Sequence, residues 1–96
     1  MASSISSGVL NADTLIFTGR NRVNAITVLT DGTNAATLDL KDGTNTSGAI
    51  KITGKCVGAN LINHILFENP VMFQNGIYAD VTGTGATFIV YYGGVS

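Results

Sequence analysis

Apolar and polar residues alternate along much of this chain, most clearly over residues 75–93, which read NGIYADVTGTGATFIVYYG. A period of two is typical of β-strands with one buried face. Two such runs flank Gly83-Thr84-Gly85, so we predict a β-hairpin in which an even loop pairs Val81 with Ala86 and Gly83 opens a type II′ turn. This register gathers one apolar face, which consists of Ile77, Ala79, Val81, Ala86, Phe88 and Val90.

The opposite face of the predicted hairpin mixes aromatic, apolar and polar side chains. Its members are Tyr78, Asp80, Thr82, Thr87, Ile89 and Tyr91. Such a face is too apolar for ordinary solvent-facing surface and too polar for a core. We therefore expect it to contact another subunit.

Shorter runs of the same kind occupy the rest of the chain. Val9-Leu10 and residues 14–18 (TLIFT) predict the first short strands. Residues 23–30 (VNAITVLT) are β-branched on both faces, which is typical of a central strand covered on two sides. Residues 36–41 and 50–53 alternate regularly, so we predict that they continue from this strand as a meander of half-buried strands.

Residues 57–67 fit two structures. Leu61, Ile62, Ile65 and Leu66 have the spacing of one or two helical turns, whereas the alternation that ends at Phe67 fits a strand. We favour a loop followed by a strand. Pro70 then lies at a strand start or on an edge strand, because it cannot donate a hydrogen bond within a central ladder. We predict that residues 71–73 form a short strand that leads into the predicted hairpin.

These runs together predict about eight short strands and little or no helix. Turn signals about every ten residues are typical of an all-β protein built as an antiparallel β-sandwich or small barrel, and a jelly roll is one such arrangement. We expect a single sandwich domain over residues 9–96. The Ser-rich residues 1–8 precede it, and we predict that they form a flexible arm.

The tetrapeptide DGTN occurs twice, at residues 31–34 and 42–45. Asp, Asn and Thr oxygens are hard ligands that suit calcium. The same residues are those that β-turns require, and no glutamate lies at a ligand spacing in either copy. We therefore favour two turns without a metal.

Charge is scarce in this chain. Only 11% of its 96 residues are charged, against about 25% in an ordinary soluble domain. Five basic residues and a net charge of −1 cannot neutralise a run of phosphates, so we expect no nucleic-acid partner. No stretch approaches the roughly 18 apolar residues of a membrane span, and the N-terminus lacks the features of a signal peptide. We expect no membrane partner and synthesis in the cytoplasm.

The small size of the chain and its positive mean hydropathy of +0.32 favour self-association, since small cores are marginal alone. We expect a homo-oligomer, and a homotrimer before other symmetries. The residues that we expect at its interfaces are Ile5, Arg20, Arg22, Tyr78, Ile89 and Tyr91. The arginine pair could bind carboxylates on a partner.

The sequence contains no recognisable catalytic grouping. His64 is the only histidine and Cys56 the only cysteine, and neither has a partner residue placed to activate it. We interpret His64 as structural and Cys56 as a small buried apolar residue. We expect no enzyme activity, no cofactor and no small-molecule substrate.

Residues 69–92 resemble the C-terminal half of small bacteriophage virion β-proteins, which are capsid-associated or tail-associated structural subunits. The matching features are Pro70, Phe73, the segments NGIY and VTGTG, and IVYY at residues 89–92. The resemblance implies a structural protein of the virion and supplies no catalytic residues.

Two functions are compatible with this resemblance. The first is a capsid decoration (cement) protein on the capsid exterior, which bridges and stabilises subunits of the major capsid protein. The alternative is a structural or host-binding, glycan-binding module at the tail or neck. Tyr78, Tyr91 and Tyr92 are predicted on strands and not in the loops where sugar-stacking aromatics usually lie, which favours decoration.

Overall fold

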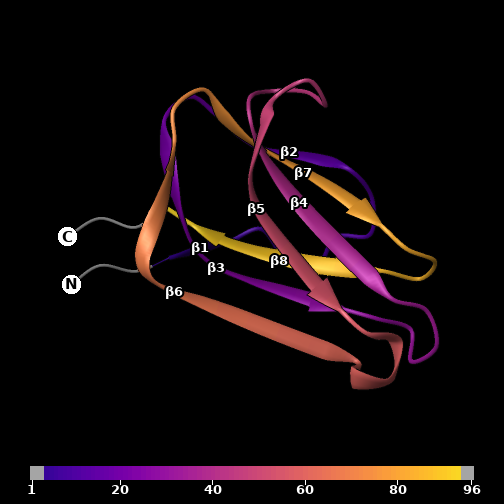
Figure 1. Cartoon of the computed structure of the whole chain (residues 1–96). Coiled ribbons are helices and arrows are strands. Elements are labelled where there is room, and N and C mark those ends of the chain that lie inside the picture. Colours follow the sequence, from indigo (N-terminus) through magenta and orange to yellow (C-terminus); the bar gives the residue numbers. More distant parts are fainter. Residues whose placement is uncertain (1–3, 94–96) are drawn as a thin grey trace.

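The computed structural model describes residues 4–93 as an all-β protein with two antiparallel sheets (Figure 1). The predicted fold class and the near absence of helix are confirmed. One short 3-10 helix, η1 (Gly58–Asn60), interrupts the strands. The strands are β1 (Ile5–Ser6), β2 (Thr14–Thr18), β3 (Asn21–Leu29), β4 (Ala36–Asp42), β5 (Ala49–Cys56), β6 (Ile62–Phe73), β7 (Gly76–Thr82) and β8 (Thr87–Tyr92).

The strand order shows how the chain folds. Sheet A has the order β1-β8-β3-β6, and sheet B has the order β2-β7-β4-β5. The first strand thus pairs with the eighth, the second with the seventh, the third with the sixth and the fourth with the fifth. A long antiparallel ribbon that is folded at its middle and rolled into two layers has this pairing, which is the arrangement of a jelly roll.

The core lies between the two sheets and consists of the inward side chains of each strand. In β4, Leu38 and Leu40 are fully buried while Asp39 and Lys41 point outward, as their alternation predicts. Phe73 and Phe88 are the largest fully buried side chains. Cys56 is buried at the end of β5, which confirms its interpretation as a small apolar residue.

The predicted hairpin over residues 75–93 is wrong. Strand β7 belongs to sheet B, between β2 and β4, whereas β8 belongs to sheet A, between β1 and β3. Val81 therefore lies opposite Leu38 and not opposite Ala86. The turn between the strands crosses from one sheet to the other, and it is closed by a hydrogen bond from the Ala86 amide to the Gly83 carbonyl oxygen at 3.3 Å.

The apolar residues assigned to the hairpin still reach the core. Five of the six are buried and Val81 is half-buried against them. They face one another across the sandwich from opposite sheets and do not share a face of one sheet. Period-two alternation specifies which side chains of a strand point inward. It does not specify whether two such strands are neighbours in one sheet or lie in facing sheets, because the side chains are buried in both arrangements.

The predicted meander is right for one connection and wrong for the other. Strands β4 and β5 are hydrogen-bonded neighbours in sheet B, as expected. Strand β3 lies in sheet A, so the connection from β3 to β4 crosses the sandwich. Strand β3 does occupy a central position in its sheet, between β8 and β6.

The boundary predicted for the N-terminal arm is corrected by strand β1. Ile5 lies opposite Tyr92 and Ser6 opposite Tyr91, so these residues form one edge of sheet A. The Ser7 amide adds a hydrogen bond to the Val90 carbonyl oxygen at 2.9 Å. Residues 1–3 of the predicted arm lie outside the described residues.

The segment after β5 follows the expected order of loop and then strand, but the short strand predicted over residues 71–73 is not separate, because these residues end β6. Helix η1 leads into β6, the longest strand, which forms the other edge of sheet A. The ladder between β3 and β6 shifts register between Val23 and Ala25, where residues 67–70 bulge. Pro70 lies in this bulge of an edge strand, one of the two positions predicted for it.

Candidate interaction surface

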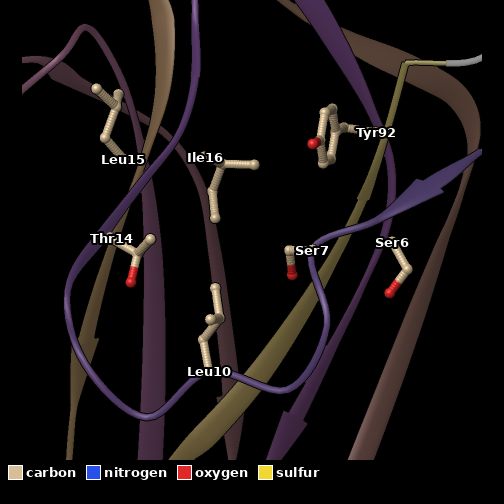
Figure 2. Close-up of a pocket in the computed structure, with 7 residues that line it drawn as sticks. All are labelled: Ser6, Ser7, Leu10, Thr14, Leu15, Ile16 and Tyr92. Atoms are coloured by element: carbon tan, nitrogen blue, oxygen red, sulfur yellow. The ribbon is translucent and has the colours of Figure 1, made fainter.

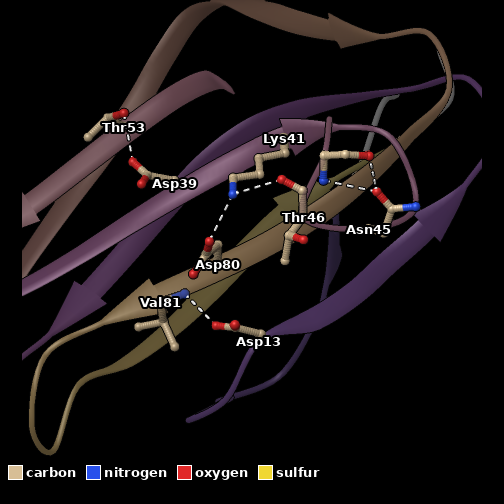
Figure 3. A network of polar contacts seen from close by, with 9 residues as sticks. Asp13, Asp39, Lys41, Asn45, Thr46, Thr53, Asp80 and Val81 are labelled. Carbon is tan, nitrogen blue, oxygen red and sulfur yellow. Dashed lines mark hydrogen bonds and ion pairs between the residues drawn. The ribbon is translucent and has the colours of Figure 1, made fainter. Parts of the chain in front are cut away.

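The outer face of sheet B carries the charged network of this protein (Figure 3). Lys41 Nζ donates a hydrogen bond to Asp80 Oδ2 at 2.9 Å and another to the Thr46 carbonyl oxygen at 3.1 Å. The hydrogen bond to Asp80 raises the pKa of Lys41. Thr53 Oγ1 donates to Asp39 Oδ1 at 2.8 Å. The Lys41–Asp80 pair and the Thr53–Asp39 hydrogen bond therefore satisfy these charged groups within the face itself.

The outer face of sheet A differs in character, and we define it by nine residues from three neighbouring strands. They are Ala25, Thr27 and Leu29 of β3, Ile62, His64 and Leu66 of β6, and Thr87, Ile89 and Tyr91 of β8. None of these side chains carries a permanent charge. Leu66 is 73% exposed and Ile62 is 55% exposed, so large apolar side chains meet solvent at the β6 side of this face.

The middle of this face is held together by His64. Its Nδ1 atom is hydrogen-bonded to Thr27 Oγ1 at 2.7 Å. Its ring packs edge-on against Tyr91, with 5.8 Å between ring centroids and 77° between ring planes. These contacts cover Thr27, which is only 4% exposed although it points away from the core.

A shallow depression of about 390 Å³ lies beside His64. Its wall includes Ala25, Leu66 and Tyr91, together with the polar residues Ser4 and Asn24. The Asn24 Nδ2 atom donates to Ser4 Oγ at 2.8 Å and to the Gly93 carbonyl oxygen at 3.0 Å, so this amide ties the chain ends to β3. The depression thus extends the outer face of sheet A with a mainly apolar hollow.

The structure distributes the predicted interface residues over several surfaces. Ile89 and Tyr91 lie together on the outer face of sheet A, whereas Tyr78 lies on β7 in sheet B. Ile5 is 52% exposed on the β1 edge. The interface itself stays a prediction, and so does the homotrimer.

The two arginines lie where β2 turns into β3. Arg20 is exposed in the turn itself. Arg22 is half-buried at the start of β3, where its Nε donates to the Gly93 carbonyl oxygen at 3.1 Å. One arginine of the pair is therefore already engaged with the chain's own backbone.

Sequence reasoning missed Ile62 and Leu66, the most exposed apolar residues of the outer face of sheet A. Their alternation with Asn63 and Ile65 was visible in the sequence. The same residues also fitted a helix, and this ambiguity hid the face to which they belong.

A second hollow of about 180 Å³ lies at the β1 and β2 side of the sandwich (Figure 2). It is lined by Ser6, Ser7, Leu10, Thr14, Leu15, Ile16 and Tyr92. The Ser7 hydroxyl accepts a hydrogen bond from the Val90 amide and donates one to the Gly8 carbonyl oxygen, both at 2.9 Å. Thr14 Oγ1 donates to the Ala12 carbonyl oxygen. These hydroxyl groups hold the connection from β1 to β2 in place.

The first DGTN copy is a turn, as predicted. Asp31 Oδ1 accepts hydrogen bonds from the amides of Asn34 and Thr33 at 2.8 and 2.9 Å. These bonds, from Asn34 first, hold the pKa of Asp31 below its usual value. The carboxylate is thus occupied by its own turn.

The second DGTN copy is arranged differently. Asp42 ends β4, and its carboxylate accepts hydrogen bonds from the Gln74 and Asn75 amides in the turn between β6 and β7. Partial burial acts to raise the pKa of Asp42, but the hydrogen bonds from Asn75 and Gln74 outweigh it, so the pKa is lowered. Within residues 4–93, no three His, Cys, Asp or Glu residues gather as metal ligands.

Comparison with known proteins gives no family assignment. No family model matches this chain, and neither a curated protein nor a solved structure matches it. Among residues 4–93, no helix has the length and hydropathy needed to span a bilayer. The distribution of charged and apolar side chains over the two sheets is therefore the basis for a functional proposal.

Proposed function

We propose that this chain is a structural protein of a bacteriophage virion, and specifically a decoration protein that attaches to the outside of the capsid. The observation that carries this proposal is the contrast between the two outer faces of the sandwich. The outer face of sheet A is uncharged and exposes Ile62 and Leu66, whereas the outer face of sheet B carries the Lys41–Asp80 ion pair.

An uncharged face with exposed apolar residues suits attachment to a protein surface. Burying a Leu or Ile side chain contributes about 1.5–3 kcal/mol, although ordering and docking costs offset part of this. Tyr91 and His64 add aromatic surface and polar atoms beside them. A single face of this size gives modest affinity. Firm attachment would therefore need several copies joined in one oligomer, because linked copies that bind neighbouring sites together gain affinity through effective concentration.

Two further features agree with a virion partner. Residues 69–92 resemble small phage virion β-proteins. The jelly-roll order of the two sheets is also common in viral capsid domains, although this fold serves lectins and enzymes as well. The fold therefore agrees with the proposal without selecting it, and binding to particles is the test.

The test compares two variants that add the same charge on opposite sheets. Leu66→Asp places a carboxylate on the outer face of sheet A, while Ile50→Asp places one on β5 in sheet B, where Ile50 is 55% exposed. Each variant is incubated with capsids of the phage that encodes the chain, grown without this protein. We expect Leu66→Asp to bind at least about tenfold more weakly and Ile50→Asp to bind like wild type.

Melting curves show whether both variants are folded. Equal binding by the two variants would mean that the outer face of sheet A is not the attachment surface. Binding to purified tails and not to capsids would favour the tail-associated alternative and contradict decoration.

A further inference from the structure

The described residues include four edge strands, and three of them have features that prevent pairing with another chain. Strand β1 is only two residues long. Strand β2 has an irregular register between Leu15 and Phe17. Strand β5 carries the exposed residues Lys51 and Lys55. Short length, bulges and lysines are the usual protections of exposed edges.

Strand β6 has no such protection over its first half. Residues 62–67 read INHILF and contain no Lys, Asp, Glu or Pro. Glu68 and Pro70 follow only in the bulge. Figure 1 shows β6 along the border of the sandwich, and within residues 4–93 no strand of sheet A lies beyond it. A long apolar edge of this kind is a template for strand pairing.

One hydrogen bond shows which backbone groups of β6 point toward β3 and which point away from it. The Thr30 amide donates to the Leu61 carbonyl oxygen at 2.8 Å. Hydrogen-bonded pairs recur at every second residue of an antiparallel ladder, so the next pairs toward β3 are Val28–Asn63 and Ile26–Ile65. The amides and carbonyl groups of the intervening β6 residues point away from β3. These residues are Ile62, His64 and Leu66.

The same three residues also place their side chains on the outer face of sheet A. The open edge therefore combines free backbone groups with uncharged side chains. A two-fold axis brings the residue at its centre beside its own counterpart, so a charged residue at that position would repel itself. The uncharged edge of β6 can therefore pair with β6 of a second copy without charge repulsion.

We propose that two copies of this chain associate through β6, with the two strands antiparallel about a two-fold axis at His64. His64 then lies opposite His64 of the partner subunit, and Ile62 lies opposite the partner's Leu66. This register uses every outward backbone group of the three residues and forms about six hydrogen bonds. Pairing joins the two copies of sheet A into one continuous sheet.

The size of this contact sets its strength. Pairing along a few residues buries less than the roughly 1,200 Å² that separates weak interfaces from standard ones. The dimer should therefore be reversible, with a dissociation constant in the micromolar range. A two-fold pairing also gives a dimer, where the sequence predicted a trimer. The proposal does not depend on a capsid partner.

The central test changes the residue at the two-fold axis. His64→Lys and His64→Glu each place like charges opposite one another, so each variant alone should dimerise at least about tenfold more weakly than wild type. An equimolar mixture should recover the dimer, with one copy of each variant, because opposite charges then meet. Sedimentation equilibrium gives the affinities, and native mass spectrometry gives the composition of the dimer.

A second measurement needs no variant and covers the case in which these substitutions disturb folding. In wild-type protein, exchange of the Ile62, His64 and Leu66 amides with solvent should slow as protein concentration rises through the micromolar range. The Asn63 and Ile65 amides point toward β3, so their protection should not depend on concentration. A wild-type protein that stays monomeric at 1 mM or forms a trimer, or a variant mixture that fails to recover a dimer, would overturn the proposal.

Discussion

Asp42 and Asn75 join two turns that are far apart in the sequence: the Asp42 Oδ1 atom accepts a hydrogen bond from the Asn75 amide at 2.8 Å. The Gln74 amide lies 3.1 Å from both oxygens of the same carboxylate. This carboxylate therefore links the end of β4 in sheet B to the turn that leads from sheet A into β7.

Replacing this carboxylate should loosen the turn between β6 and β7. Asp42→Asn keeps one acceptor oxygen but removes the charge. We expect the free energy of unfolding to fall by about 1 kcal/mol, which is less than the roughly 1.5–3 kcal/mol of charged hydrogen bonds because solvent screens this site. Glu68→Gln is the matched control, because Glu68 is exposed and has no hydrogen bond within residues 4–93. Urea unfolding measures both changes, and equal effects would contradict the role of Asp42.

Stability should fall in acid because Asp31 and Asp42 have a lowered pKa in the folded protein. A carboxyl group with a lowered folded pKa stabilises the fold above its unfolded value, near 3.8, and this contribution is lost as pH falls through the folded pKa. The melting temperature should therefore decrease below about pH 4. The double variant Asp31→Asn, Asp42→Asn should show a shallower decrease, and an unchanged slope would contradict this explanation.

Phe88 should be essential to the core although the hairpin predicted around it does not exist. Its side chain is fully buried on β8, so Phe88→Ala should cost about 3–5 kcal/mol of unfolding free energy. The next residue, Ile89, faces outward and is half-buried. Ile89→Ala should cost roughly 1 kcal/mol or less. Similar losses at both positions, measured by chemical unfolding, would contradict the assigned faces of β8.

Gly54 marks a close approach between β5 and β3 across the core. A Cβ atom at Gly54 would lie 2.5 Å from Ile26 Cδ1, which belongs to a fully buried side chain. We expect Gly54→Ala to destabilise the protein by about 1–3 kcal/mol through overpacking. Ile26→Val removes the clashing methyl group, so the double variant should lose less stability than the sum of the two single variants. Additive losses would show that the clash is relieved elsewhere.

Alternation in the sequence was sufficient to identify the inward side chains but not their sheets. Ile77 and Phe88 were both predicted on an apolar face, and both are buried. Neighbouring strands lie about 4.8 Å apart and facing sheets about 10 Å apart, and the short turn after Thr82 can span either distance. Local sequence therefore could not distinguish a hairpin from a crossing between sheets.

The outer face of sheet A depends on long-range pairing and was only partly predictable. Ile89 and Tyr91 were expected at an interface from their own strand. Ile62 and Leu66 join them only because β3 lies between β6 and β8 in sheet A. No local sequence pattern shows that β6 and β8 are both neighbours of β3, because this arrangement arises only when the whole ribbon folds into two layers.

The most direct test of the proposed function is a cryo-electron microscopy map of the intact phage particle. Decoration predicts density for this sandwich at many symmetry-related positions on the capsid exterior, with Leu66 and Tyr91 facing the shell. Density for the chain only at the tail or neck, or on the capsid with sheet B facing the shell, would contradict the account.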